Sequence, residues 1–76
     1  MVDKKGEQIM NTRDICNRIR GKRNEKRITQ EEMASRLGIT QKTYNLKENC
    51  KTEFSLTEIA TILNVLECNF TDIFLK

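Results

Sequence analysis

The segment from residue 30 to residue 49, QEEMASRLGITQKTYNLKEN, most strongly restricts the folds open to this chain. Thr29, followed three residues later by Glu32, matches the capping-box pattern, so we expect a helix to begin directly after Thr29. Gly38 suits the left-handed residue that ends a helix, and Thr40 suits the cap of another. The segment therefore predicts two short helices joined by a tight turn.

The apolar residues of this segment indicate how the two helices pack. Met33, Ala34 and Leu37 share one face of the first helix, and the small Ala34 lets the second helix cross it closely. Ile39 and Tyr44 are expected to point into the core. The outward face of the second helix then carries polar side chains of the kinds that hydrogen-bond base edges and phosphates. This arrangement is a helix-turn-helix, which most often binds DNA. The expected outward residues are Gln41, Lys42, Thr43 and Asn45.

Most of the chain, from about residue 13 to residue 76, resembles the Cro/repressor (Xre-like) type of DNA-binding domain of phage and bacterial transcriptional regulators. The family's Glu-Asn-Gly-Lys run after the recognition helix appears here as Glu48, Asn49, Cys50 and Lys51. The resemblance implies an all-α, compact domain of five short helices around one core.

The expected organisation is one domain and one tail. Residues 1–11 mix polar side chains with one glycine and have no apolar period, so we predict a flexible N-terminal arm there. Residues 12–76 form the predicted DNA-binding domain, with its helix-turn-helix at residues 30–49. A chain of 76 residues is near the lower limit for one core, so dimerisation would help it.

The resemblance also implies roles for single residues. In the family, a glutamine at the start of the first motif helix contacts a backbone phosphate, and Gln30 stands there. An arginine late in the preceding helix pairs with a glutamate after the recognition helix, which implies an ion pair between Arg23 and Glu48. Asn49 and Lys51 are implied as further phosphate contacts. The residues implied to face the major groove are Gln41, Lys42, Asn45 and Leu46.

Side-chain chemistry completes the predicted contact set. Lysine can donate to guanine O6 and N7, and glutamine can pair with adenine, so Lys42 and Gln41 are the first candidates for reading bases. Leu46 could contact a thymine methyl group or pack into the core. The predicted base contacts are Gln41, Lys42, Thr43, Asn45 and Leu46. The predicted phosphate contacts are Gln30, Thr40, Asn49, Lys51, Arg20 and Lys22.

Three positions depart from the family's pattern. Lys47 and Lys22 stand where apolar residues are usual, and a buried lysine costs free energy unless it has a partner or its stem reaches solvent. A change at Lys47 could rotate the recognition helix slightly or shift packing onto Leu46. Cys50 replaces glycine, and a left-handed non-glycine residue costs roughly 1 kcal/mol, so we expect a changed turn there.

Basic residues are concentrated in the part of the chain that holds the motif. Residues 1–53 carry 13 basic and 8 acidic side chains, a net charge of +5, whereas residues 54–76 sum to −2. Within residues 18–27 the only acid is Glu25. Such a stretch can neutralise phosphates and make affinity depend on salt, or it can be a solvated helix end that binds nothing. Its basic members are Arg18, Arg20, Lys22, Arg23, Lys26 and Arg27.

A helix is also expected before the motif. It runs from Thr12 to near Arg23, with Asp14 in its first turn and Gly21 weakening its end. Residues 24–28 are the predicted connector. The residues expected to face inward are Ile15, Cys16 and Ile19.

Two more helices are expected after the motif. Ser55 with Glu58 forms a second capping box, and Asn69 with Asp72 begins a last turn or two. The apolar residues that recur at helical spacing after Ser55 are Leu56, Ile59, Ile62, Leu63 and Leu66.

The apolar residues at the C-terminal end have two interpretations. Phe70, Ile73 and Phe74 could close the core, because a small domain needs every large side chain. They could instead form a dimer face, as family members often pair through this end and so place two recognition helices about 34 Å apart on a near-palindromic site. Phe54 is expected to be core.

The cysteines argue against a disulfide scaffold and against a metal site. Cys16, Cys50 and Cys68 are an odd number, lie far apart in sequence and form no C-x-x-C pair, and the chain has no histidine. Cys16 and Cys68 are expected to be small packing residues. We expect Cys50 to be exposed beside Lys47 and Lys51, where a lowered thiol pKa would make DNA binding sensitive to oxidation.

Several classes of protein find no support in the sequence. The sequence contains no histidine that could act as a base, no motif of paired carboxylates and no glycine-rich phosphate loop. We therefore predict that the chain is not an enzyme and needs no cofactor. No stretch approaches the roughly 20 apolar residues of a membrane span, and residues 1–11 lack the apolar core of a signal peptide, so we expect a cytoplasmic protein. No small-molecule ligand is predicted.

The sequence therefore predicts a sequence-specific regulator of transcription, a repressor that binds double-stranded operator DNA as a homodimer. One rival is a protein-interaction module, such as an antitoxin or antirepressor partner, that uses the C-terminal apolar surface. Another is a basic surface that binds RNA or anionic lipid through residues 18–27. That second rival lacks aromatic platforms for single strands, because all four aromatic residues fit core positions.

Overall fold

Each helix begins at a residue whose backbone or side chain satisfies its first turn. Asn11, Thr29, Thr40 and Ser55 each accept a hydrogen bond from the backbone three residues on, and Thr29 and Ser55 form complete capping boxes. The backbone N–H of Asn69 donates to the Asp72 carboxylate at 2.9 Å. The computed structural model describes residues 11–75, which contain the helices α1 (Thr12–Glu25), α2 (Gln30–Leu37), α3 (Gln41–Glu48), α4 (Leu56–Leu66) and α5 (Phe70–Phe74).

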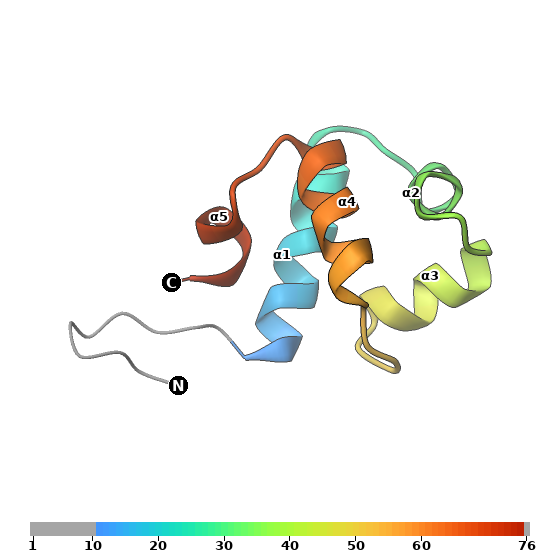
Figure 1. Cartoon of the computed structure of the whole chain (residues 1–76), viewed down its shortest axis with the longest axis horizontal. Helices are drawn as coiled ribbons and strands as arrows, with labels where there is room; N and C mark the ends of the chain where they lie inside the picture. The colour runs from blue at the N-terminus through green and yellow to red at the C-terminus, as the bar shows by residue number, and fades with distance from the viewer. Residues whose placement is uncertain (1–10, 76) are drawn as a thin grey trace.

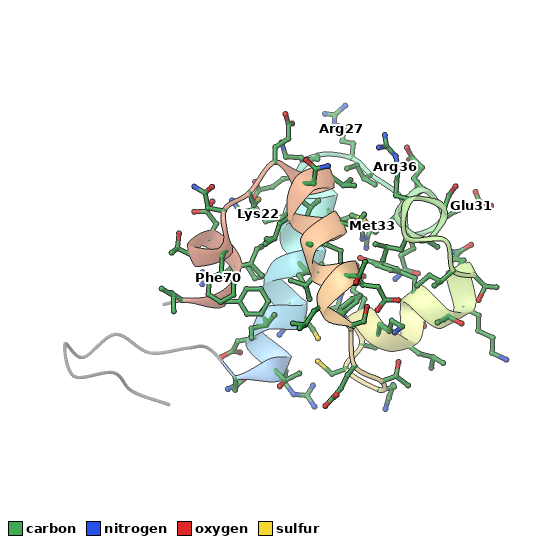
Figure 2. All side chains as sticks on the ribbon, in the orientation of Figure 1. Lys22, Arg27, Glu31, Met33, Arg36 and Phe70 are labelled. Atoms are coloured by element: carbon green, nitrogen blue, oxygen red, sulfur yellow. The ribbon has the colours of Figure 1, made fainter. Side chains whose placement is uncertain are left out.

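The five helices enclose one core, as the all-α prediction required. Helix α2 packs against α3 and α4, while α1 packs against α3 on one side and α5 on the other (Figure 1). Ala34 is buried, and Met33 points between α2 and α4 (Figure 2). The buried apolar cluster consists of Ile19, Met33, Ala34, Tyr44, Ile62, Leu66 and Ile73.

Helix α1 is longer than predicted. It continues to Glu25, two residues past Arg23, and so takes up part of the predicted connector at residues 24–28. Gly21 lies inside the helix on its exposed side, with no neighbouring atom near the position of a Cβ. A glycine there costs only about 1 kcal/mol relative to alanine, and the burial of Ile19 together with the ion pair of Arg23 with Glu48 outweighs that cost. Residues 1–10 of the predicted arm lie outside the described residues.

Two predicted core residues are exposed. Leu56 is 89% exposed and Phe70 is 51% exposed. Side chains of a helix lean towards its N-terminus, so those of the first residues of α4 and α5 extend past the packed face of each helix. Ile73 is fully buried, whereas Phe74 is half-buried and stacks on Phe70 with ring centroids 4.5 Å apart. The C-terminal cluster is thus divided between the core and the surface.

None of the helices in the described part of the chain is long and apolar enough to cross a membrane. Residues 11–75 also contain no cluster of three or more side chains that could hold a metal ion.

Candidate nucleic-acid interface

The turn between α2 and α3 orients the two helices of the motif. Gly38 is left-handed, with φ of 72°, and its N–H donates to the Ser35 carbonyl at 3.2 Å. The N–H of Ile39 donates to the Ala34 carbonyl at 3.0 Å, which closes the end of α2. A Cβ on Gly38 would meet no atom within 4 Å, so the turn requires glycine for its backbone conformation and not for space.

Buried Glu48, at the end of α3, joins three helices. Its carboxylate accepts two hydrogen bonds from Arg23 of α1, at 2.8 and 3.0 Å, so the ion pair that the resemblance implied is present. It also accepts the Tyr44 hydroxyl at 2.6 Å and the Gln30 side-chain amide at 3.1 Å. These last two donors were not predicted from the sequence, although the spacing of four residues between Tyr44 and Glu48 was a signal for the first.

These donors decide the charge of Glu48. Burial by itself raises the pKa of the carboxyl, but the hydrogen bonds from Arg23, Tyr44 and Gln30 outweigh burial and hold the pKa below its ordinary value. Burial and the hydrogen bond to Glu48 both raise the pKa of Tyr44, so its hydroxyl stays protonated and donates. Glu48 is therefore an ionised, fully bonded anchor for the recognition helix.

Most of the predicted base contacts on helix α3 are exposed. Gln41, Lys42 and Asn45 are exposed. Leu46 is 37% exposed, so it is not a core residue but a surface residue at the edge of the same helix. Thr43 is half-buried, and its hydroxyl accepts a hydrogen bond from the Thr40 hydroxyl at 2.9 Å.

Several predicted phosphate contacts are linked to each other around the end of α3. Asn45 donates to the Gln30 amide oxygen at 3.2 Å, and Gln30 in turn donates to Glu48. Arg20 donates to the Asn49 side chain at 2.7 Å and to the Glu48 carbonyl at 3.2 Å. The structure thus brings Gln30, Arg20 and Asn49 beside α3. Thr40 caps the other end of that helix, and the exposed Lys51 follows Asn49 by two residues.

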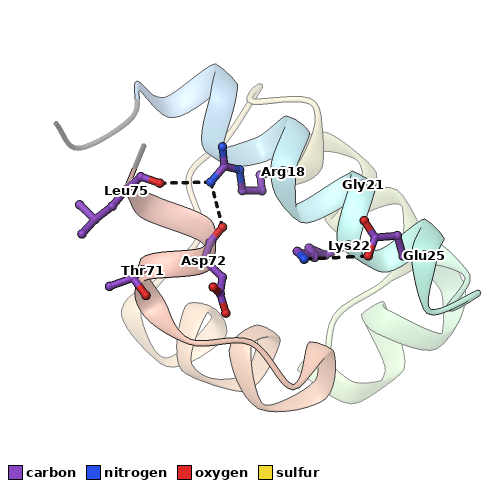
Figure 3. Close-up of a pocket in the computed structure, with 7 residues that line it drawn as sticks. All are labelled: Arg18, Gly21, Lys22, Glu25, Thr71, Asp72 and Leu75. Atoms are coloured by element: carbon purple, nitrogen blue, oxygen red, sulfur yellow. Dashed lines mark hydrogen bonds and ion pairs between the residues drawn. The ribbon is translucent and has the colours of Figure 1, made fainter. Parts of the chain in front are cut away.

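Lys22, also a predicted phosphate contact, does not lie in this group. It lies with Arg18, Thr71 and Asp72 around a hollow between α1 and α5 (Figure 3). The only ion pair it makes among residues 11–75 is with Glu25, at 3.9 Å. Two residues along a helix correspond to a rotation of about 200°, so Arg20 and Lys22 face opposite ways.

Lys47 has a partner, which accounts for this departure from the family's pattern. Its ammonium group donates to the Glu53 carbonyl and to the Glu58 carboxylate, both at 2.9 Å, and its side chain is only 15% exposed. Burial raises the pKa of Glu58, but the Ser55 backbone N–H and Lys47 outweigh it and hold the pKa low. The capping glutamate of α4 therefore also holds the end of α3.

The expected change of turn at Cys50 is wrong. Cys50 has φ of 62°, the left-handed conformation that the family's glycine would take. Its N–H donates to the Lys47 carbonyl at 3.0 Å and the next N–H, of Lys51, donates to the Leu46 carbonyl at 2.8 Å, which together close the helix. Cys50 is also half-buried and not exposed, because its thiol faces α1.

The fold and the outward side chains define the class of protein as a helix-turn-helix DNA-binding domain. A comparison with protein families matches residues 18–74 to the Cro/C1-type HTH DNA-binding domain. Because the match covers most of the chain, the chain belongs to this family and is a DNA-binding regulator of transcription. No curated protein and no solved structure matches the chain.

Proposed function

We propose that this protein is a sequence-specific repressor that places α3 in the major groove of operator DNA. The observation that carries the proposal is that α3 combines buried, hydrogen-bonded side chains with exposed polar ones. Tyr44 and Glu48 are buried and fixed by hydrogen bonds, which leaves Gln41, Lys42 and Asn45 outward on a rigid helix. Such a helix reads bases, while residues at its ends bind phosphates.

The contacts divide into two kinds. Gln41 and Lys42, with Thr43, Asn45 and Leu46, form the proposed base-reading surface. The proposed phosphate contacts flank that surface and are Gln30, Thr40, Asn49, Lys51 and Arg20. DNA phosphates would either replace the present hydrogen-bond partners of Gln30, Arg20 and Asn49 or be bound in addition to them. Additional binding is open because an arginine and an amide each have several donors. The proposal involves no reaction, cofactor or small-molecule ligand, and it places the protein in the cytoplasm with the DNA.

Substitution of three lysines tests this division. The operator is first selected from random duplexes, and Kd is then measured at fixed salt on the selected and on a random duplex. Lys42→Ala should cost about 1 to 3 kcal/mol on the selected duplex and little on the random one. Lys51→Ala should weaken both equally, because phosphates carry no sequence. The matched control Lys22→Ala should change neither. Equal losses on both duplexes for Lys42→Ala would refute the base contact.

We further propose that the repressor binds as a homodimer. An apolar groove of about 290 Å³ between α1, α4 and α5 supports this proposal. It is lined by the exposed Leu56 and Phe70 and the half-buried Phe74. Ile73 is buried and takes no part in the proposed face. A symmetric contact across this groove would give two recognition helices for two half-sites about 34 Å apart.

The same groove supports the alternative of a protein-interaction module, such as an antitoxin or antirepressor partner. Measuring duplex binding at several salt concentrations distinguishes the two functions. A repressor binds duplex DNA with an affinity that falls steeply as salt rises. A monomer that shows no such binding, but binds another protein tightly through Leu56 and Phe70, would favour the alternative.

A further inference from the structure

Two cysteines that are 34 residues apart in the sequence meet at the junction of α1 and α3. The Cys16 thiol donates to the Lys47 carbonyl at 3.5 Å, and that carbonyl also accepts the backbone N–H of Cys50 at 3.0 Å. In the opposite direction, the Cys50 thiol donates to the carbonyl of Thr12 at 3.4 Å, one helical turn before Cys16. Each thiol therefore reaches the backbone of the other's segment, and the Cys50 thiol is close enough to affect the pKa of Cys16.

We propose that Cys16 and Cys50 form a redox modification site, at which a peroxide creates an intramolecular disulfide that weakens DNA binding. The effect on DNA binding rests on the proposed function, whereas the disulfide itself does not. Cys68, the third thiol, donates instead to the carbonyl of Leu66, on another part of the surface.

The two thiols have different roles in the reaction. Cys50 is half-buried, whereas Cys16 is buried. Burial, together with the neighbouring Cys50 thiol, raises the pKa of the Cys16 thiol to about 12, so it stays protonated at neutral pH. Cys50 is therefore the thiol that reacts first with peroxide, and Cys16 is the resolving thiol. Cys16 also lines the apolar groove, which gives small molecules a second approach.

The proposed reaction balances with hydrogen peroxide as the oxidant. The Cys50 sulfur attacks one peroxide oxygen and the O–O bond breaks, which gives a sulfenic acid and one water. The Cys16 sulfur then attacks the Cys50 sulfur, the S–O bond breaks, and the Cys16 proton leaves with the hydroxide as a second water. The two sulfurs together lose two electrons, and the peroxide gains them.

The disulfide would disturb the proposed DNA contacts through the turn that holds Cys50. A disulfide places its sulfurs about 2.05 Å apart, closer than two thiols in contact, so the turn must move towards α1. Asn49 and Lys51, both proposed phosphate contacts, flank Cys50 in that turn. Arg20 donates to the Asn49 side chain, so its position would change as well.

Peptide mapping tests the disulfide directly. The full chain is treated with hydrogen peroxide, alkylated and digested with trypsin without reduction. Cleavage after basic residues gives DICNR from residues 14–18 and ENCK from residues 48–51. We expect these two peptides to be joined, with a mass two hydrogens below their sum. A Cys68→Ser variant should give the same product, and a Cys50→Ser variant should not. Absence of the joined peptide after Cys50 has been oxidised would overturn the proposal.

Duplex binding tests the consequence. Oxidation should raise the Kd for the selected duplex at least about tenfold, and dithiothreitol should restore it. Cys50→Ser should bind equally before and after peroxide, while Cys68→Ser should respond like the unchanged chain. A joined peptide with unchanged Kd would contradict the regulatory role. If the reduced chain bound no duplex at all, the proposed function would fail, while the joined peptide would still establish or refute the thiol pair.

Discussion

At the scale of single residues, Glu48 decides most of the geometry of the recognition helix. A carboxylate with no exposed surface is costly to bury, and here that cost is offset by donors from α1, α2 and α3 itself. The bonds from Arg23 fix α3 relative to α1. Arg23 also donates to the Ile28 carbonyl at 2.8 Å, which ties the connector after α1 to the same group. Removal of the Glu48 charge would leave Arg23 buried without its counter-charge, whereas Glu48 also has Arg20 as a partner, with Nε and Oε1 3.5 Å apart.

Glu48→Gln should destabilise the fold by about 3 kcal/mol, because Arg23 would lose its buried counter-charge. Tyr44→Phe is the matched comparison, since it removes one hydrogen bond from Glu48 and leaves the ion pair, and it should cost only about 1 to 2 kcal/mol. Urea unfolding followed by circular dichroism at neutral pH measures both. A smaller loss for Glu48→Gln than for Tyr44→Phe would contradict this account.

The lowered pKa of Glu48 also predicts how stability depends on pH. The unfolded chain has an ordinary glutamate pKa of about 4.3. Because the folded pKa is lower, the stabilisation is complete above about pH 4.3 and is lost as pH falls towards the folded pKa. The free energy of unfolding should therefore fall between pH 7 and pH 3, and by less in Glu48→Gln. The variant should keep some acid dependence, since the pKa of Glu58 is lowered too.

At the scale of helices, the helix-turn-helix depends on backbone conformation at its ends. Gly38 and Cys50 both take left-handed conformations, at the ends of α2 and α3. At the far end of α3, Lys47 ties the helix to the capping glutamate of α4. The recognition helix is consequently held at its start by the turn and at its end by charges on two other helices.

Replacing each of two glycines with alanine distinguishes the effect of backbone conformation on stability from the effect of steric crowding. Gly38→Ala should destabilise the fold by about 1 kcal/mol, because alanine is strained at positive φ although the space is open. Gly21→Ala should stabilise it by about 0.5 to 1 kcal/mol, because Gly21 lies inside a helix and is equally uncrowded. Thermal and urea unfolding of both variants check the signs. A loss of stability in both would contradict the explanation.

At the scale of the whole molecule, the two surfaces proposed to bind DNA and a second copy lie on different sides of one small core. The outward face of α3 carries the polar residues, and the groove between α1, α4 and α5 carries the exposed apolar ones. Figure 1 shows α5 and α3 on opposite sides of α1 and α4. A second copy bound at the groove would leave α3 free for DNA.

A charge placed in the groove tests the proposed dimer. Leu56→Glu should raise the dimer dissociation constant at least about tenfold, because it puts a carboxylate into an apolar contact. The fold should be retained, since Leu56 is 89% exposed. Thr57→Glu adds the same charge to the first turn of α4 and should leave the dimer intact. Sedimentation equilibrium measures both, and an unchanged dimer in Leu56→Glu would argue against this interface.

Local sequence determined the helices and the turn, because caps and left-handed residues act within a few positions of the chain. Thr29 with Glu32, Gly38 and Thr40 correctly placed the start of α2, its end and the start of α3. The inward position of Tyr44 followed from helical spacing in the same way. The family could be predicted from these patterns together with the run Glu48, Asn49, Cys50 and Lys51 at the end of α3.

Only the tertiary structure decided which distant residues meet. Nothing in local spacing indicates that Lys47 binds Glu58, or that Cys16 lies against Cys50. Periodicity suggested a buried Leu56, but whether a helix end is covered depends on what packs beside it, and nothing in the described chain covers this one. Such contacts join segments that are far apart in sequence, so they depend on how the helices cross, and that is set by the packing of the whole core.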